Sequence, residues 1–170
     1  MNDQATSEIA SYFRRRAVRY LERYPTSERR FRDWFVRTCR KKYPDLEAAE
    51  MKTLGDSMVA FATELGLLDD VRLAEALVRS YQRRAYSRRQ MDAKLRAKGL
   101  PAAIIEHATA VVGSDDDLES AKAFLQKKRV VRDGVNLSFD DKRKLLAAMV
   151  RRGFGYSVAK QALESVENLS

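Results

Sequence analysis

The chain has 170 residues, of which 45% are apolar and 34% charged, which suits one ordinary domain or several small helical units with charged outer faces. Its formal net charge of +9 favours a polyanionic partner such as nucleic acid. There is no apolar stretch of the roughly 20 residues that a membrane span needs, no signal-peptide core at the start, and a single cysteine, Cys39. We therefore expect a soluble cytoplasmic monomer with no membrane partner, internal disulfide or cofactor.

Three helices are expected before Gly66. After a frayed terminus up to about Ser7, apolar residues at helical spacing predict a helix over 9–24 that Pro25 ends. A second helix starts at Thr26 or Ser27 and stops at the Tyr43-Pro44-Asp45 break. A third runs over 51–65, with Gly55 as a point where it kinks or splits.

The stretch 65–100 is the most basic part of the chain. Asp69 or Asp70 is expected to cap a helix whose apolar stripe includes Val78, with Arg72, Arg79 and Arg83 on the opposite face. Ser87 is expected to cap a second helix, with Met91 and Leu95 inward and Gly99 at its end. Between Arg79 and Lys98 there are eight Lys or Arg residues and one acid, Asp92. This clustering indicates a binding surface more than an active site.

Four further helices are expected after Gly99. Pro101 lies in the first turn of a helix over 101–112 that Gly113 ends, and Ser114 with Asp117 fits a capping box for the next. Residues 130–139 have no helical period and predict a loop. Asp140 or Asp141 starts a helix that Gly153 ends, and Ser157 begins the last one.

The middle helices repeat one another. The cap-type residues Ser27, Ser87 and Asp141 stand 60 and 54 positions apart, and each is followed four and eight positions later by apolar residues such as Phe31 and Phe35. Tandem helical units that depend on their neighbours for packing show such self-similarity. We predict an all-α protein of three tandem three-helix units in an elongated array. Their ranges are 1–66, which is divergent and carries an insertion, 67–113 and 114–170.

Two other classes of protein fit the residues poorly. His107 is the only histidine and Cys39 the only cysteine, so histidine-dependent triads and Cys/His zinc sites lack parts, and no glycine-rich phosphate loop is present. Residues 87–112 have a helix-turn-helix outline, but the second helix, PAAIIEHATAVV, carries no Lys or Arg. A protein that recognises phosphates and shape fits better than an enzyme or a base reader.

The order and spacing of these units resemble the RecX family. The matching strings are LGLLDD (65–70), AEALVRS (74–80), Arg88-Arg89, Lys98-Gly99 and KLLAAMVRRGFGYSVAKQALE (144–164). The resemblance is good over 65–112, fair over 118–166 and weaker before 60. Where relatives commonly have Gly-Tyr-Gly-Pro, this chain has Ala85-Tyr86-Ser87-Arg88. The resemblance implies a non-enzymatic regulator that lies in the groove of the RecA–DNA filament and restrains ATP turnover and strand exchange in recombination and DNA repair.

The expected partners are the RecA filament and the phosphates of single- and double-stranded DNA. The alternative is a free-standing DNA- or RNA-binding helical protein without sequence preference. Arg14-Arg15-Arg16 fits a solvated helix face and a contact surface equally well, and Tyr86 is placed to stack on a base. The expected binding residues are Arg72, Arg79, Arg83, Arg84, Tyr86, Arg88, Arg89, Arg96, Arg143, Lys144 and Arg151.

Overall fold

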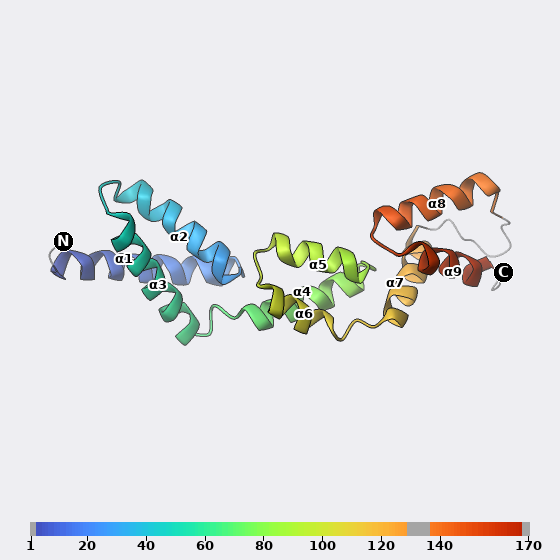
Figure 1. Cartoon of the computed structure of the whole chain (residues 1–170). Helices are drawn as coiled ribbons and strands as arrows, with labels where there is room; N and C mark the ends of the chain where they lie inside the picture. The colour runs from blue at the N-terminus through green and yellow to red at the C-terminus, as the bar shows by residue number, and fades with distance from the viewer. Residues whose placement is uncertain (1–2, 129–136, 168–170) are drawn as a thin grey trace. The chain divides into compact units, whose positions relative to one another are not determined.

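The computed structural model describes residues 3–128 and 137–167, which form nine α-helices and no strand (Figure 1). The expectation of an all-α helical array is confirmed. The helices are α1 Asp3–Arg23, α2 Glu28–Lys42, α3 Ala48–Glu64, α4 Asp70–Arg83, α5 Arg88–Ala97, α6 Ala102–Thr109, α7 Ser114–Lys127, α8 Phe139–Arg151 and α9 Tyr156–Glu167. The expected loop 130–139 lies mostly outside the described residues.

The chain divides into two compact bodies. The N-terminal body comprises Met1–Leu73 and Lys98–Pro101, and the C-terminal body comprises Ala74–Ala97 and Ala102–Ser170. In the N-terminal body α3 packs on both α1 and α2, and in the C-terminal body α5 packs on α6 while α9 packs on α7 and α8. The boundaries of the three expected helical units stay a prediction.

Several helix starts follow the expected capping chemistry. The backbone N–H of Arg30 donates to Ser27 Oγ over 3.4 Å, and the N–H of Gln90 donates to Ser87 Oγ over 3.2 Å. Of the two residues expected to cap α4, Asp69 is the cap, because it accepts from the N–H of Arg72 at 2.9 Å. Asp70 accepts instead from the N–H of Glu28 at 2.9 Å.

Other predicted starts are wrong by a few residues. The cap of α8 is Ser138, which accepts from the N–H of Asp141, rather than Asp140 or Asp141. At α7 the reciprocal bond joins the N–H of Gly113 to Asp116 at 2.8 Å, one position before the expected Ser114–Asp117 pair. Each site offered several short polar side chains in a row, and local pattern alone does not choose among them. The first helix begins at Asp3 rather than after Ser7, since no glycine or proline interrupts it.

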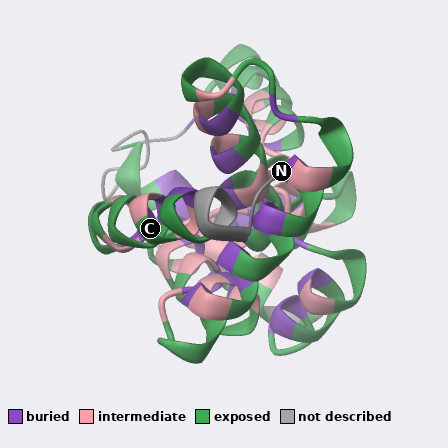
Figure 2. Cartoon of the chain, turned by 90° about the vertical axis from the view of Figure 1, so that its left-hand side faces the viewer, coloured by how far each residue is buried: buried purple, intermediate pink, exposed green. Residues whose placement is uncertain are grey.

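The core of the N-terminal body is built from α1, α2 and α3. Phe13, Phe31, Phe35 and Cys39 are fully buried, and the rings of Phe13 and Phe35 meet edge to face with centroids 4.9 Å apart. Gly55 does not split α3: it lies inside the helix, where a Cβ would come within 3.3 Å of the Phe35 ring. The glycine therefore permits close packing of α3 on α2. Buried and exposed positions alternate along the helices (Figure 2).

The repeat seen in the sequence keeps its packing register. The positions four and eight residues after each predicted cap are buried in all three copies: Phe31 and Phe35, Met91 and Leu95, Leu145 and Met149. In the third copy the cap moves three residues earlier, so α8 gains almost one turn at its start without shifting its buried face. Burial rather than capping therefore preserves the register.

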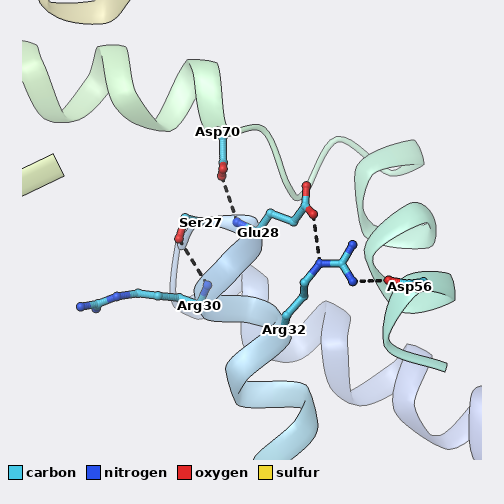
Figure 3. A network of polar contacts seen from close by, with 6 residues as sticks. All are labelled: Ser27, Glu28, Arg30, Arg32, Asp56 and Asp70. Carbon is cyan, nitrogen blue, oxygen red and sulfur yellow. Dashed lines mark hydrogen bonds and ion pairs between the residues drawn. The ribbon is translucent and has the colours of Figure 1, made fainter. Parts of the chain in front are cut away.

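A polar joint occurs twice, once within each body. In the N-terminal body Ser27 Oγ donates to the carbonyl of Lys98 at 2.6 Å. Close to it, Asp70 accepts from the N–H of Glu28 (Figure 3). In the C-terminal body Ser87 Oγ donates to the carbonyl of Arg152 at 2.9 Å while Asp117 accepts from the N–H of Arg88 at 2.8 Å. In each joint the serine at the start of one repeated helix donates to a backbone carbonyl at the end of the next repeated helix, where carbonyls have no partner within the helix. In this way the capping serines connect segments far apart in the sequence.

The first joint continues into an ion-pair network. Arg32 lies between Glu28 Oε1, at 3.0 Å, and Asp56 of α3, which it also contacts (Figure 3). The guanidinium of Arg32 lowers the pKa of Asp56, mainly through their hydrogen bond. The network ties the first turn of α2 to α3 at the surface of the N-terminal body.

Candidate nucleic-acid interface

The predicted binding residues of α4 are exposed and differ in their partners. Arg72, Arg79 and Arg83 are all exposed. Arg79 lies 3.7 Å from Glu75, an exposed i,i+4 pair of little strength. The carbonyl of Arg83 accepts from Lys127 Nζ at 2.6 Å, which brings α7 to the end of α4. Lys127 thus adds a positive charge beside Arg83, and the sequence spacing had not placed it there.

The turn from α4 to α5 is tightly held. Ala85 has a φ of 54°, the left-handed region that glycine favours, and its side chain is buried. The N–H of Tyr86 donates to the carbonyl of Tyr81 at 3.1 Å, and the Ser87 joint anchors the far side of the turn. The turn therefore adopts a conformation suited to the glycine of the family pattern although this chain has alanine. Its rigidity fixes where Arg84 and Arg88 project.

Tyr86 is half-buried and surrounded by cations. Arg152 lies over its ring at 5.3 Å, Lys94 Nζ at 4.9 Å, and the Tyr81 ring is 5.5 Å away. The ring thus concentrates two cations at the turn. Base stacking at Tyr86 stays a prediction. Lys94 and Arg152 were not among the predicted binding residues. For Arg152 the reason is that only the folded chain brings it to this turn.

Most of the predicted basic residues in α5 and in the turn before it lack an acidic partner among the described residues. Arg88 donates to the carbonyl of Val112 at 3.4 Å, at the long limit of a hydrogen bond. Arg84, Arg89 and Arg96 are exposed and have no ion-pair partner among the described residues. We call residues Arg83, Arg84, Arg88 and Arg89 the basic turn.

The third predicted group lies on α8 and combines charge with exposed apolar surface. Arg143 is paired with Asp140 at 3.4 Å, while Lys144 and Arg151 are exposed. Arg143 and Arg151 also line a hollow of about 670 Å³ between α8 and α9. We call it the α8–α9 hollow; its other lining residues are Phe139, Lys142, Leu146, Ala147, Val150, Tyr156, Lys160, Leu163 and Glu164. Phe139 is 82% exposed and Tyr156 64%, so this part of the surface suits a protein partner more than phosphates alone.

The described residues hold little that resembles catalytic machinery. No group of three or more His, Cys, Asp or Glu side chains that would hold a metal ion occurs among them. Burial raises the pKa of the Cys39 thiol, which makes it a poor nucleophile, and His107 is exposed on α6. Within the same residues, none of the helices combines the length and apolar character that crossing a membrane requires.

Comparison with known proteins gives consistent matches. Two family profiles match, described as "RecX, second three-helix domain" over residues 69–108 and "RecX, third three-helix domain" over 115–163. The chain is 33% identical to Regulatory protein RecX of Agrobacterium fabrum over 162 residues, covering 94% of this chain and 86% of the relative. It is 28% identical to Regulatory protein RecX of Myxococcus xanthus, covering 91% and 86%.

Solved structures support the same fold. A crystal structure of RecX from Lactobacillus salivarius superposes with a TM-score of 0.70 at 16% identity, covering 95% of this chain and 98% of that one. A second structure, of a regulatory protein RecX, gives a TM-score of 0.68 at 17% identity, covering 94% and 74%.

Proposed function

The chain belongs to the RecX family of regulatory proteins, and we propose that it regulates the recombinase RecA by binding the RecA–DNA filament, without catalysing a reaction of its own. The observation that carries this proposal is the basic turn. Its four arginines are close together in the sequence and exposed, and they flank a turn that the Ser87 hydrogen bond anchors. Their charges suit a polyanion.

The basic turn contacts the DNA backbone in this proposal. Guanidinium groups bind phosphate oxygens through paired hydrogen bonds, and such contacts position a protein without reading sequence. Lys94, Lys127 and Arg152 reinforce the same region through Tyr86 and Arg83. Binding is therefore expected to show little sequence preference and to weaken steeply with salt.

The α8–α9 hollow contacts the recombinase. Phe139, Val150 and Tyr156 expose apolar surface that phosphates do not cover favourably. Four cations, Lys142, Arg143, Arg151 and Lys160, line the hollow against one acid, Glu164. The partner surface that would complement these cations and exposed apolar side chains is one that is itself acidic and apolar, and we expect the recombinase to offer it.

The proposal is tested by titrating ATP turnover of preformed RecA filaments with this protein. If it binds the assembled filament, turnover falls at well below one molecule per RecA, and excess naked single-stranded DNA relieves the effect only partly. Inhibition that needs DNA-coating amounts, and that vanishes with competitor, contradicts filament binding. That result would favour the alternative, a free-standing nucleic-acid-binding protein.

Matched variants separate the two proposed contacts. Reversing Arg83, Arg84 and Arg89 to Glu is expected to abolish binding of double-stranded DNA by the isolated protein while helix content by circular dichroism is retained. The control reverses Arg37, Arg40 and Lys41, equally exposed cations of α2. Equal losses in both variants mean that a diffuse field, not the basic turn, binds DNA. Phe139→Ala is expected to weaken inhibition of the filament and to leave DNA binding unchanged.

A further inference from the structure

A second basic surface lies on α1, in the N-terminal body. A groove of about 420 Å³ is formed there by four arginines and four aromatic residues, and no acid lines it. We call it the α1 groove; its residues are Tyr12, Arg15, Arg16, Arg19, Tyr20, Arg23, Tyr24 and Trp34. All but two belong to α1; Tyr24 directly follows that helix, and Trp34 comes from α2.

The spacing along α1 explains why these side chains share one face. Tyr12, Arg16, Tyr20 and Tyr24 follow one another at steps of four, and Arg19 and Arg23 lie one position before the last two. Residues four apart lie one above the other on a helix. From Arg15 to Arg23 the helix rises about 12 Å, at 1.5 Å per residue, long enough for a short run of phosphates.

Two aromatic rings of the groove are stacked, and a third, exposed ring lies beside them. Tyr20 and Trp34 lie parallel, with ring centroids 4.2 Å apart and an angle of 10° between the planes. The Tyr24 ring lies 5.5 Å from the Tyr20 ring, at an angle of 46° to it, and Tyr24 is 50% exposed. Arg23, an exposed side chain, lies over the Tyr24 ring at 5.5 Å. These rings offer apolar faces at the edge of solvent.

The arginines of the groove lack anionic partners. Arg15, Arg16, Arg19 and Arg23 are exposed and make no ion pair with any described residue. Two of their polar contacts are neutral: Arg16 reaches the Tyr12 hydroxyl at 3.5 Å, and Arg19 reaches the carbonyl of Arg15 at 3.5 Å. Desolvation acts to raise the pKa of the Tyr12 phenol, but the charges of Lys42 and Arg16 outweigh it and lower that pKa overall, in keeping with a positive local field. Like charges side by side repel one another, and a bound anion relieves that repulsion.

We propose that the α1 groove is a binding site for single-stranded nucleic acid, in which bases stack on Tyr24 and the Tyr20–Trp34 pair while the arginines contact phosphates. Proteins that bind single strands without sequence preference combine a positive groove with aromatic stacking surfaces. Double-stranded DNA offers phosphates but keeps its base faces covered. The site deepens the proposed function, on which it rests, by giving the N-terminal body a preference for single strands.

Trp34 is the only tryptophan of the chain and reports directly on the groove. In a titration of the full chain with oligothymidylate, stacking is expected to quench Trp34 emission. Heparin, a polyanion without bases, is expected to displace the oligonucleotide and restore the emission. Duplex DNA of equal length is expected to quench much less. Quenching by poly-glutamate equal to that by oligothymidylate would assign the groove to an acidic peptide and overturn the proposal.

Variants separate stacking from charge. Tyr24→Leu is expected to weaken binding in the quenching titration about tenfold, within the range of one lost base stack, and Tyr24→Phe is expected to bind like the unmodified chain. Reversing Arg19 and Arg23 to Glu is expected to weaken it at least as much, whereas reversing Arg37 and Arg40, outside the groove, has little effect. Unchanged quenching in Tyr24→Leu with normal helix content overturns the site.

The two proposals fail in distinguishable ways. If labelled oligothymidylate binds by anisotropy and Trp34 emission does not change, the groove is wrong and the basic turn accounts for binding. If Trp34 is quenched and filament ATP turnover is unaffected, the groove stands and the regulatory proposal is wrong.

Discussion

Replacing Gly153 by alanine tests the polar joint of the C-terminal body. Gly153 has a φ of 85°, and a Cβ added there would come within 2.7 Å of Ser87 Oγ, the atom that donates to the carbonyl of Arg152. Gly66 is the matched control, because its φ of 68° is similar and no neighbouring atom lies within 4 Å of the position that a Cβ would take. Any difference between the two substitutions therefore measures the clash with Ser87.

The expected sizes follow from the two sites. An alanine with positive φ costs about 1–2 kcal/mol of unfolding free energy at either position. At Gly153 the displaced Ser87 hydroxyl also loses its hydrogen bond, which adds about 1 kcal/mol, and the clash adds to this. We expect a loss of about 3 kcal/mol for Gly153→Ala and about 1–2 kcal/mol for Gly66→Ala. In a chain of this size each kcal/mol lowers Tm by about 2–4 °C.

The assay is thermal unfolding followed by circular dichroism, combined with a double-mutant cycle. Ser87→Ala removes the hydroxyl that the new methyl group at position 153 would strike, so Gly153→Ala is expected to cost less in that background. Gly66→Ala and Ser87→Ala are expected to be additive. Equal losses at Gly66 and Gly153, or additivity of Gly153→Ala with Ser87→Ala, would refute the role assigned to the joint.

Three further predictions concern single side chains. Burial raises the pKa of Asp70 above its ordinary 3.8, so the protonated carboxyl stabilises the fold in acid, and this contribution is lost as pH rises through the folded pKa. Asp70→Asn keeps an acceptor for the Glu28 N–H and is expected to raise Tm at neutral pH, but not in acid below the ordinary pKa. A lower Tm at neutral pH would contradict this. The buried Cys39 thiol, whose pKa burial raises, is expected to react with Ellman's reagent only on unfolding; rapid reaction in the native protein would place it at the surface. Arg89→Gln is expected to reduce the slope of log affinity for DNA against log salt concentration by about one, and to lower the affinity for unrelated DNA sequences to a similar degree. An unchanged slope would mean that Arg89 contacts no phosphate.

The helices could be predicted from the sequence because their signals are local. Apolar residues at steps of three and four placed Phe31, Phe35, Leu95 and Met149 in the core, and all four are buried. Glycines after the periodic stretches marked helix ends, as at Gly99, with its φ of 82°. Both signals act within one or two turns of helix, so no knowledge of the rest of the chain is needed to read them.

Which polar group satisfies which partner was decided only by the tertiary structure. Asp69 and Asp70 are equivalent candidates in the sequence, yet one caps α4 and the other bonds the N–H of Glu28, 42 positions away. The same holds for the run at 14–16: Arg14 lies over the Phe61 ring, whereas Arg15 and Arg16 line the α1 groove. Such assignments depend on which helix face meets which neighbour, and this follows from packing the apolar stripes together, a property of the whole fold rather than of any short stretch.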